Sequence, residues 1–311
     1  MAGFGKIKSK LQGHWIMNHF TIRDIENLCG IKAHTLRIWE QRYSLFVAKR
    51  KESQHRIYDN EDLKQLLRIS FLYHSGHKIS KIAALSAGEI QQLIETSSIK
   101  EDNHEAFVQQ LIEAGVDFDK EKFEKIVNGL IVRIGLEKCI INIFYPFLQR
   151  IGLLWMTNNV IPAQEHFVSH IIRKKIILAT DGLGVDKNSL YNIILFSPIG
   201  ELHELPLLTA NYFFRKYNIP TTYFGTNVAK ESLTYFLKHK AATHLYTHLI
   251  TPVNSDELNN YISSLCNNFQ DKKIVISGPA CKFIDSNHTN LQVLNSLDEL
   301  IRFAKETGAV T

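Results

Sequence analysis

The stretch HFTIRDIENLCGIKAHTLRIWEQRYSLF, residues 19–46, decides the fold of the first part of the chain. Thr21 is a suitable helix N-cap, and Asp24, three residues later, can act as the acidic member of a capping box. The apolar positions that follow recur on one helical face: Ile22, Ile25 and Leu28. Gly30 then supplies a tight turn, after which a second helical pattern begins. Two short helices joined by a glycine-containing turn predict a helix-turn-helix.

The second helical pattern, AHTLRIWEQRY, turns Leu36 and either Trp39 or Tyr43 inward. Its outward positions carry side chains of the kinds that reach phosphates and base edges of DNA. The sequence AKRKESQHRIYD that follows predicts a short β-hairpin with a basic tip. The expected DNA-contacting residues of the two segments are Lys32, His34, Thr35, Arg37, Arg42, Tyr43, Arg50 and Arg56.

Two more helices are expected in DNEDLKQLLRISFLYHSGHKISKIAAL, residues 59–85. Asn60 is a possible cap of the first of them. Its expected buried stripe consists of Leu63, Leu66, Leu67, Ile69 and Leu72.

The charge of the chain is distributed unevenly, although the formal net charge is only +5 over 311 residues. Residues 1–88 carry fifteen Lys and Arg against seven Asp and Glu, and the rest carries twenty-one against twenty-four. The basic end is where a polyanion would bind. Residues 1–17 are expected to be a basic N-terminal extension. The four scattered cysteines favour a reducing cytoplasm, and no apolar run is long enough to predict a membrane span.

Residues 18–88 resemble the winged DNA-binding domain of the MerR family. The resemblance is carried by TIRDIENLCGI, HTLRIWEQRY, RIY (56–58) and DLKQLLRISFL with GHKISKIA. It implies a dimer on double-stranded promoter DNA, with the second helix in the major groove and the wing on the flanking backbone. The wing departs from the family because Ser53 and Gln54 stand where glycine is common. A small helical protein-interaction domain is the alternative, which the basic face disfavours.

Residues 89–184 have a helical period throughout and predict a four-helix bundle. Helices are expected near 105–115 and 119–134, followed by a long helix from Leu136 that Pro146 should kink. Pro162 suits the first turn of the last helix. The expected apolar stripe of that helix includes Phe167, Ile171 and Leu178.

In residues 189–311 the spacing of the apolar residues changes, and short apolar runs of strand length alternate with helical stretches. This alternation predicts a doubly wound parallel sheet. The expected strands are YNIILFSP, TTYFGT, THLYTHLI and KKIVISG. Ligands of such sheets bind outside the carboxyl ends of the strands. His203 lies in the loop after the first strand, and Glu201 is placed to hold its imidazole by a hydrogen bond, as carboxylates do for metal-bound histidines.

A bundle followed by such a sheet resembles the cobalamin-binding modules of the methionine synthase type. Trp155, nine residues and then Glu165-His166 match the bundle signature of the light-sensing CarH/LitR regulators, which also begin with a MerR-type domain. The resemblance implies a multidomain chain: a winged helix-turn-helix, a four-helix bundle and an α/β doubly wound parallel sheet of the cobalamin-binding type. His203 would be the lower axial ligand of cobalt. Cofactor-binding residues would be Trp155, Glu165, His166, Glu201, His203, Ser277 and Gly278.

The function implied by the resemblance is that of a repressor whose operator binding and homo-oligomeric state, dimer or tetramer, respond to adenosylcobalamin and light. His166 would take the upper cobalt position after photolysis. The family pattern is not complete, since Pro206 replaces a glycine and Ser277-Gly278 replaces Gly-Gly. One alternative is therefore a MerR-type regulator whose third domain has lost cobalamin and senses another ligand or a protein.

A corrinoid carrier for methyl transfer is a third possibility, against which the N-terminal domain argues. No catalytic motif stands at a strand-to-helix turn, so an enzyme is not expected. His166 and His170 have the spacing of a metal pair, but no third ligand is evident.

Overall fold

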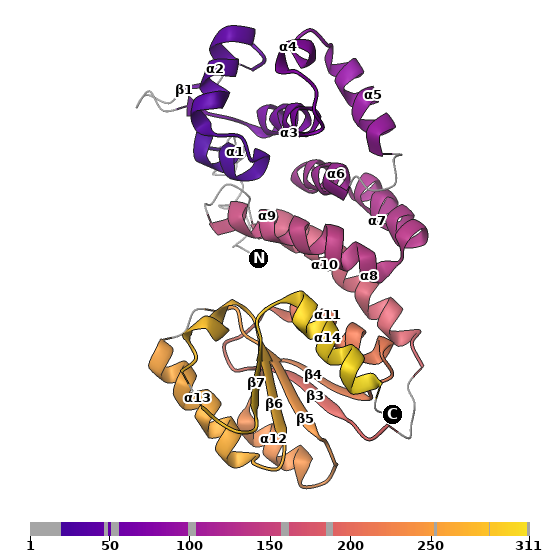
Figure 1. Ribbon diagram of the computed structural model, residues 1–311, viewed down its shortest axis with the longest axis vertical. Coiled ribbons are helices and arrows are strands. Elements are labelled where there is room, and N and C mark those ends of the chain that lie inside the picture. Colours follow the sequence, from indigo (N-terminus) through magenta and orange to yellow (C-terminus); the bar gives the residue numbers. More distant parts are fainter. Residues whose placement is uncertain are drawn as a thin grey trace, which may run out of the picture. The chain divides into compact units, whose positions relative to one another are not determined.

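The computed structural model describes residues 20–46, 49–50, 56–98, 104–156, 162–184, 189–251, 254–285 and 287–309. The chain divides into two compact units, Met1–Ile171 and Ile172–Thr311, and Figure 1 labels their elements. The division falls within helix α10 (Pro162–Asp181). The expected extension 1–17 lies outside the described residues, and the expected boundaries at 18, 88, 184 and 189 stay predictions. None of the described helices combines the length and the hydropathy that crossing a membrane would need.

Helices α1 (Ile22–Cys29) and α2 (Ala33–Tyr43) confirm the predicted helix-turn-helix. The Thr21 side chain accepts a hydrogen bond from the Asp24 backbone N–H, and the Asp24 carboxylate accepts one from the Thr21 N–H, so the capping box is complete. Gly30 ends α1 in the left-handed conformation with φ 67°, where a side chain would be strained. Leu36 and Trp39 of α2 are buried, which fixes its orientation and leaves the opposite face exposed.

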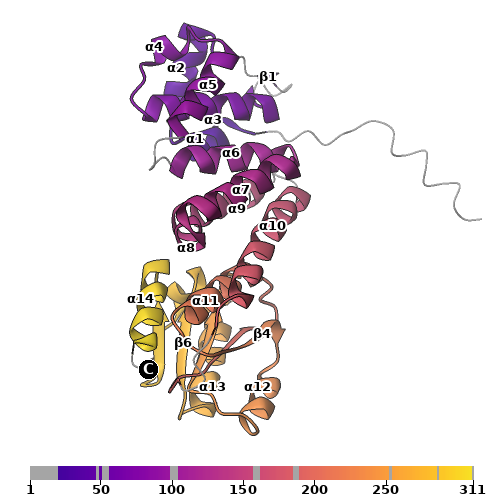
Figure 2. The same ribbon diagram turned by 90° about the vertical axis from the view of Figure 1, so that its right-hand side faces the viewer.

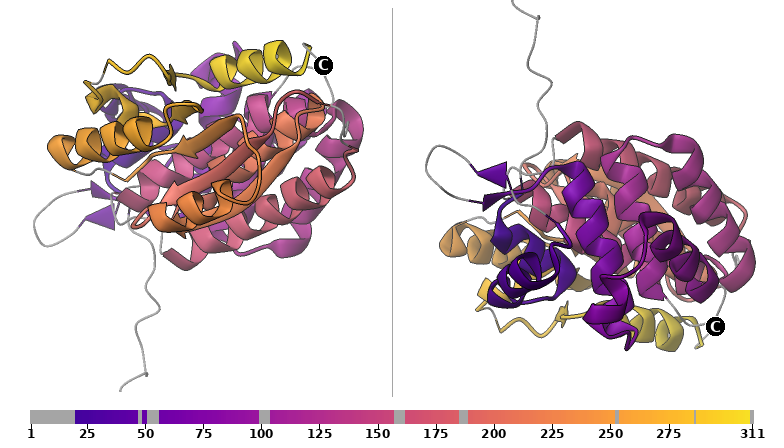
Figure 3. Two further views of the ribbon diagram at one scale, coloured as in Figure 1. Left: turned by 90° about the horizontal axis from the view of Figure 1, so that it is seen from below. Right: turned by 90° about the horizontal axis from the view of Figure 1, so that it is seen from above.

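Two short strands, β1 (Lys49–Arg50) and β2 (Arg56–Ile57), pair in antiparallel fashion beside these helices (Figure 3, right). Residues 51–55, the expected tip of this hairpin, lie outside the described part. Three helices follow: α3 (Asn60–His74), α4 (Ile79–Ile82) and α5 (Ala87–Ser98). The predicted cap Asn60 is wrong by one residue, because Asp59 forms a reciprocal capping box with Asp62. The five leucine and isoleucine positions predicted for the stripe of α3 are all buried.

The second half of unit 1 is helical, as predicted. Its elements are α6 (His104–Val116), α7 (Lys120–Ile134), α8 (Leu136–Cys139), the π-helical turn η1 (Ile140–Phe144), α9 (Tyr145–Met156) and α10. The π turn ends two residues before Pro146, a residue without an N–H that interrupts regular α-helical bonding. Helix α10 begins at Pro162, as predicted, and buries Ile171. Leu178 is 73% exposed, so its predicted place in the stripe is wrong.

Unit 2 contains a five-stranded parallel sheet in the order β4-β3-β5-β6-β7. The strands are β3 (Ile193–Pro198), β4 (Thr221–Val228), β5 (His244–His248), β6 (Lys273–Ser277) and β7 (Leu291–Leu294). Helices α11 (Glu204–Lys216) and α14 (Leu297–Gly308) lie on one face of the sheet, and α12 (Lys230–Leu237) and α13 (Ser255–Asn268) on the other (Figure 2). The doubly wound parallel sheet is confirmed. The sequence reading missed β7 and α14.

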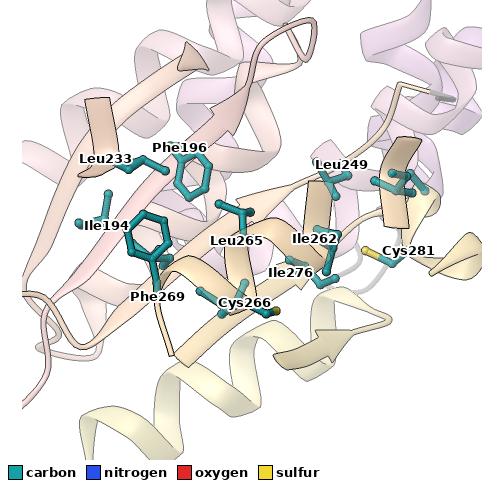
Figure 4. Close-up of a cluster of buried hydrophobic side chains, with 14 of the residues drawn as sticks. Ile194, Phe196, Leu233, Leu249, Ile262, Leu265, Cys266, Phe269, Ile276 and Cys281 are labelled. Carbon is teal, nitrogen blue, oxygen red and sulfur yellow. The ribbon is translucent and has the colours of Figure 1, made fainter. Parts of the chain in front are cut away.

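The core between the sheet and helices α12 and α13 is made of large apolar side chains, including Phe196, Leu265 and Ile276 (Figure 4). Two cysteines, Cys266 and Cys281, belong to the same cluster. The other two, Cys29 and Cys139, are buried in unit 1, so all four thiols of the chain are free and shielded from solvent.

Candidate functional site

The outward face of α2 carries polar and basic side chains, as the sequence predicted. His34, Arg37 and Arg42 are exposed on it. The Thr35 hydroxyl lies 3.3 Å from Nε2 of His34, and the guanidinium of Arg42 lies 5.6 Å from the centre of the Tyr43 ring. These contacts orient the side chains at both ends of the helix.

Two of the predicted DNA contacts are held by carboxylates. The Lys32 ammonium lies 3.0 Å from Glu26, which also accepts the Ala33 backbone N–H at the start of α2. The Arg56 guanidinium of β2 lies 2.8 Å from Glu40 of α2, and this ion pair ties the wing to the second helix. Arg50 is in β1, but its side chain lies outside the described residues.

Ion pairs that the sequence did not predict join α3 to α6 and to the residue that follows α6. The Arg68 guanidinium donates two hydrogen bonds, of 2.9 and 2.8 Å, to the carboxylate of Glu113, which is 4% exposed. Next to it, the Lys64 ammonium donates to both oxygens of Asp117 at 3.1 and 2.8 Å. Because α3 belongs to the winged helix-turn-helix and α6 to the helical region, these pairs connect the predicted DNA-binding and ligand-covering parts.

The residues predicted to cover a cofactor from the helical region lie on two elements. Trp155 is in the last turn of α9, with its side chain outside the described part. Glu165 and His166 are in the first turns of α10, where the carboxylate lies 3.0 Å from Nδ1 of the imidazole and the His166 side chain is 77% exposed. His170 is exposed one turn later, and no group of three potential metal ligands exists among the described residues.

The predicted Glu201–His203 pair lies in the loop between β3 and α11. Oε1 of Glu201 accepts hydrogen bonds from Nδ1 of His203 at 2.6 Å and from its backbone N–H at 2.9 Å. Oε2 accepts the backbone N–H groups of Ile250 and Thr251 at 2.8 and 2.7 Å. Glu201 therefore joins the loop after β3 to the loop after β5. These strands neighbour each other where the strand order reverses, the usual ligand-binding point of such sheets.

The environment of Glu201 keeps it ionised. Burial alone would raise its pKa, but the hydrogen bonds from His203 and from the backbone of Thr251 and Ile250 lower the pKa to about 2. An ionised carboxylate only accepts hydrogen bonds, so Nδ1 of His203 is the donor in this pair. The His203 side chain is 49% exposed. The arrangement presents an oriented imidazole at the carboxyl edge of the sheet.

Polar side chains form a row across the same edge. In the register of β5 and β6, His248 is opposite Ser277, and the Ser277 hydroxyl lies 2.7 Å from Nδ1 of His248 and 2.6 Å from the Tyr246 hydroxyl. Continuing the β3–β5 register places Ser197 beside His248. The Ser197 hydroxyl is buried and has no hydrogen-bond partner in the described part of the chain. Burial lowers the pKa of His248 to about 4, so this imidazole is neutral near pH 7.

Gly278, which follows this row, allows a close approach of two backbones. It has φ +105°, and a Cβ at this position would lie 2.3 Å from the carbonyl oxygen of Leu249. Leu249 immediately precedes the two amides that bind Glu201. The glycine predicted for the cofactor site thus supports the loop that holds the carboxylate.

Comparison with known proteins gives two family matches. The profile of the MerR HTH family regulatory proteins matches residues 20–89, which cover α1 to the start of α5. A profile described as B12 binding domain matches residues 108–179, which cover α6 to α10.

Known proteins are similar to different parts of this chain. The HTH-type transcriptional repressor CarH of Myxococcus xanthus is 23% identical over 224 residues, 69% of this chain and 73% of that protein. The HTH-type transcriptional regulator MlrA of Escherichia coli K12 is 31% identical over 70 residues, 22% of this chain and 29% of that protein. A monomethylamine corrinoid protein of Methanosarcina barkeri has a similar fold, with TM-score 0.51 and 14% identity over 63% of this chain and 95% of that one. The chain is a MerR-type transcriptional regulator that carries a B12 binding domain.

Proposed function

We propose that this regulator binds cobalamin through His203, whose imidazole would hold the cobalt, and that the bound cofactor controls its binding to operator DNA. The observation that carries the proposal is the Glu201–His203 pair at the point where the strand order reverses. An imidazole that ligates a metal must be oriented, and a carboxylate hydrogen-bonded to its other ring nitrogen fixes both its orientation and its tautomer. Glu201 is itself fixed by two backbone amides of the neighbouring loop.

The surroundings of His203 fit a large, flat and partly apolar ligand. Ile199 and Leu202 flank the imidazole in the same loop and are 70% and 69% exposed. Their burial under a macrocycle would contribute to binding. The Ser197 hydroxyl supplies a buried polar group that a ligand could satisfy. Pro206 lies in the first turn of α11, where proline is tolerated, so the replacement of the family glycine leaves the helix start intact.

In the helical region, Trp155, Glu165 and His166 would contact the bound cofactor. Adenosylcobalamin would supply a cobalt–carbon bond that light breaks. His166, an exposed imidazole paired with Glu165, would offer a nitrogen donor to the cobalt of the illuminated cofactor.

Regulation requires that the loaded and unloaded chains differ in their affinity for the operator, since a ligand with equal affinity for both states shifts nothing. We propose that loading favours a homo-oligomer, a dimer or tetramer, which places several α2 helices on one operator and represses transcription. The ion pairs of Arg68 with Glu113 and of Lys64 with Asp117 connect the two parts of unit 1 through which this coupling would pass.

The test is uptake of adenosylcobalamin by the full chain in darkness, read from the absorption spectrum after gel filtration. His203→Ala should lose uptake or give a spectrum without a protein nitrogen ligand. Glu201→Gln should weaken uptake roughly 10–100-fold. His239→Ala, an exposed imidazole on the turn after α12, is the matched control and should bind like the parent.

Size and operator binding, measured before and after illumination, test the regulatory part separately. His166→Ala should bind the dark form and change only the spectrum after light. A parent protein that takes up no cobalamin would refute the proposal. The protein would then be a regulator whose sheet domain binds another ligand or a protein partner. Pro206, and Ser277 with its hydroxyl bonded to Tyr246 and His248, would be the changes that exclude cobalamin.

A further inference from the structure

Helix α2 exposes an apolar side chain in the middle of its polar face. Ile38 is 51% exposed, although Leu36 and Trp39 beside it are buried. Single exposed apolar residues are common on protein surfaces. Ile38, however, lies within a stripe of exposed residues on the predicted DNA-binding face. The stripe consists of His34, Arg37, Ile38, Gln41 and Arg42.

The order of side chains across this stripe follows from the 3.6-residue period of the helix. Measured around the axis from His34, Ile38 and Gln41 lie about 40° to one side and about 20° to the other. Arg37 and Arg42 lie further out, at roughly 60° and 80° on opposite sides. The two cations therefore border the stripe, and Ile38 and Gln41 occupy its centre with His34.

This order matches the cross-section of a DNA major groove. A helix that lies in the groove meets phosphates at both of its edges and base edges at its centre. Arg37 and Arg42 would reach the two phosphate backbones. Ile38 and Gln41 would face the bases. In the first turn of the helix, the Thr35 hydroxyl and the His34 ring lie 3.3 Å apart and bond to each other.

The chemistry of the central pair selects particular bases. Thymine presents a C5-methyl group in the major groove, and adenine presents N7 and N6, which a glutamine amide can contact with two hydrogen bonds. Isoleucine is β-branched and stiff at χ1 in a helix, so it loses little rotamer freedom on contact with a methyl group. Residues 38 and 41 are separated by about 4.5 Å along the axis, close to one base-pair step of roughly 3.4 Å.

We propose that Ile38 and Gln41 read a thymine and an adenine in adjacent or nearly adjacent base pairs of each operator half-site. The assignment rests on DNA binding through α2 and is independent of the cobalamin response. It adds two base-reading residues to a face on which the cations supply general affinity.

The test is selection of bound sequences from a randomised double-stranded DNA library by the full chain, followed by affinity measurement on the selected site. Ile38→Ala should lose the preference for thymine at one position of each half-site, and Gln41→Ala the preference for adenine at one neighbouring position. Each variant should bind the selected site about tenfold more weakly. Its affinity for unrelated DNA should stay unchanged, because the phosphate contacts remain.

Val132→Ala and Gln92→Ala are the controls, since both replace exposed side chains of the same types on other helices, with Val132 88% exposed. They should leave the selected motif intact. A motif that Ile38→Ala and Gln41→Ala do not alter, or a loss spread evenly over all positions, would overturn this assignment alone. A parent chain that selects no motif would overturn it together with specific operator binding.

Discussion

The two units each contain a buried glutamate, and the two are held in different ways. Glu113 and Glu201 are both 4% exposed. Glu113 is bound by long cationic side chains: the guanidinium of Arg68, and the ammonium of Lys122 at 3.5 Å. Glu201 is bound mainly by backbone N–H groups and one imidazole. A partner on a long side chain can move away and pair elsewhere, whereas a backbone amide moves only with its loop. Glu113 is therefore suited to a joint between helices, and Glu201 to a fixed support.

The largest expected loss of stability comes from disturbing the backbone that holds Glu201. Gly278→Ala should destabilise unit 2 by about 4 kcal/mol, since positive φ strains a side chain and the new Cβ would displace the Leu249 backbone. The amides that bind Glu201 would move with it. Urea unfolding monitored by circular dichroism measures this loss. Gly129→Ala in α7, where no atom lies within 4 Å of the added Cβ, is the control and should stabilise the chain by about 0.5–1 kcal/mol. Equal stability of Gly278→Ala and the parent would contradict the close approach.

Removing the carboxylate of the joint should have the next largest effect. Glu113→Ala leaves Arg68 without its partner in a half-buried position, which should cost about 3 kcal/mol of unfolding free energy. Glu121→Ala, exposed at the start of α7, should cost less than about 1 kcal/mol. Equal urea midpoints for Glu113→Ala and Glu121→Ala would contradict the role of Glu113 as the carboxylate that joins the helices.

Acid should weaken the support by a smaller amount. The pKa of Glu201 is lowered from 4.5 to about 2, so its carboxylate stabilises the fold above pH 4.5 and this stabilisation is lost as the pH falls toward 2. Between pH 6 and pH 3 the loss should be about 2 kcal/mol. Glu201→Gln has no ionisable group here and should lack this part of the pH dependence. Parallel slopes for parent and variant would mean that the carboxylate is not selectively stabilised.

The smallest effect is expected at the exposed edge of the joint. Asp117 is 42% exposed where it pairs with Lys64, so Asp117→Asn should cost less than about 1 kcal/mol. The difference from the parent should shrink in 0.5 M NaCl, because salt screens exposed pairs. A cost as large as that of Glu113→Ala would show that exposure does not distinguish the two pairs.

The parts of the molecule that could be predicted from sequence are those set by neighbours in the chain. The helix-turn-helix follows from a capping box and one glycine, and the Glu201–His203 pair from two residues on a strand-to-helix loop. The cap of α3 was missed by one residue because only Asp59, with Asp62 at the third helical position, can form the reciprocal pair. The strand β7, four residues long, is too short to give a clear alternation.

The rest depends on residues far apart in the chain. Arg68 and Glu113 are 45 positions apart, and each taken alone resembles a solvated charge on a helix. The row Ser197, His248 and Ser277 exists only through the register of three strands. Leu178 continues an apolar spacing in the sequence, yet the helix buries Ile176 and Thr180 instead. The predicted roles of the site residues toward DNA and cobalamin stay predictions.

The buried cysteines can report which unit of the protein unfolds. Cys29 and Cys139 belong to unit 1, and Cys266 and Cys281 to unit 2. Burial raises the pKa of Cys29, Cys139 and Cys281 to about 12, so none of these thiols is reactive in the closed fold. A thiol reagent therefore modifies only molecules in which the surrounding unit has come apart. Peptide mapping of the modified cysteines would report which unit yields first, without a label having been introduced.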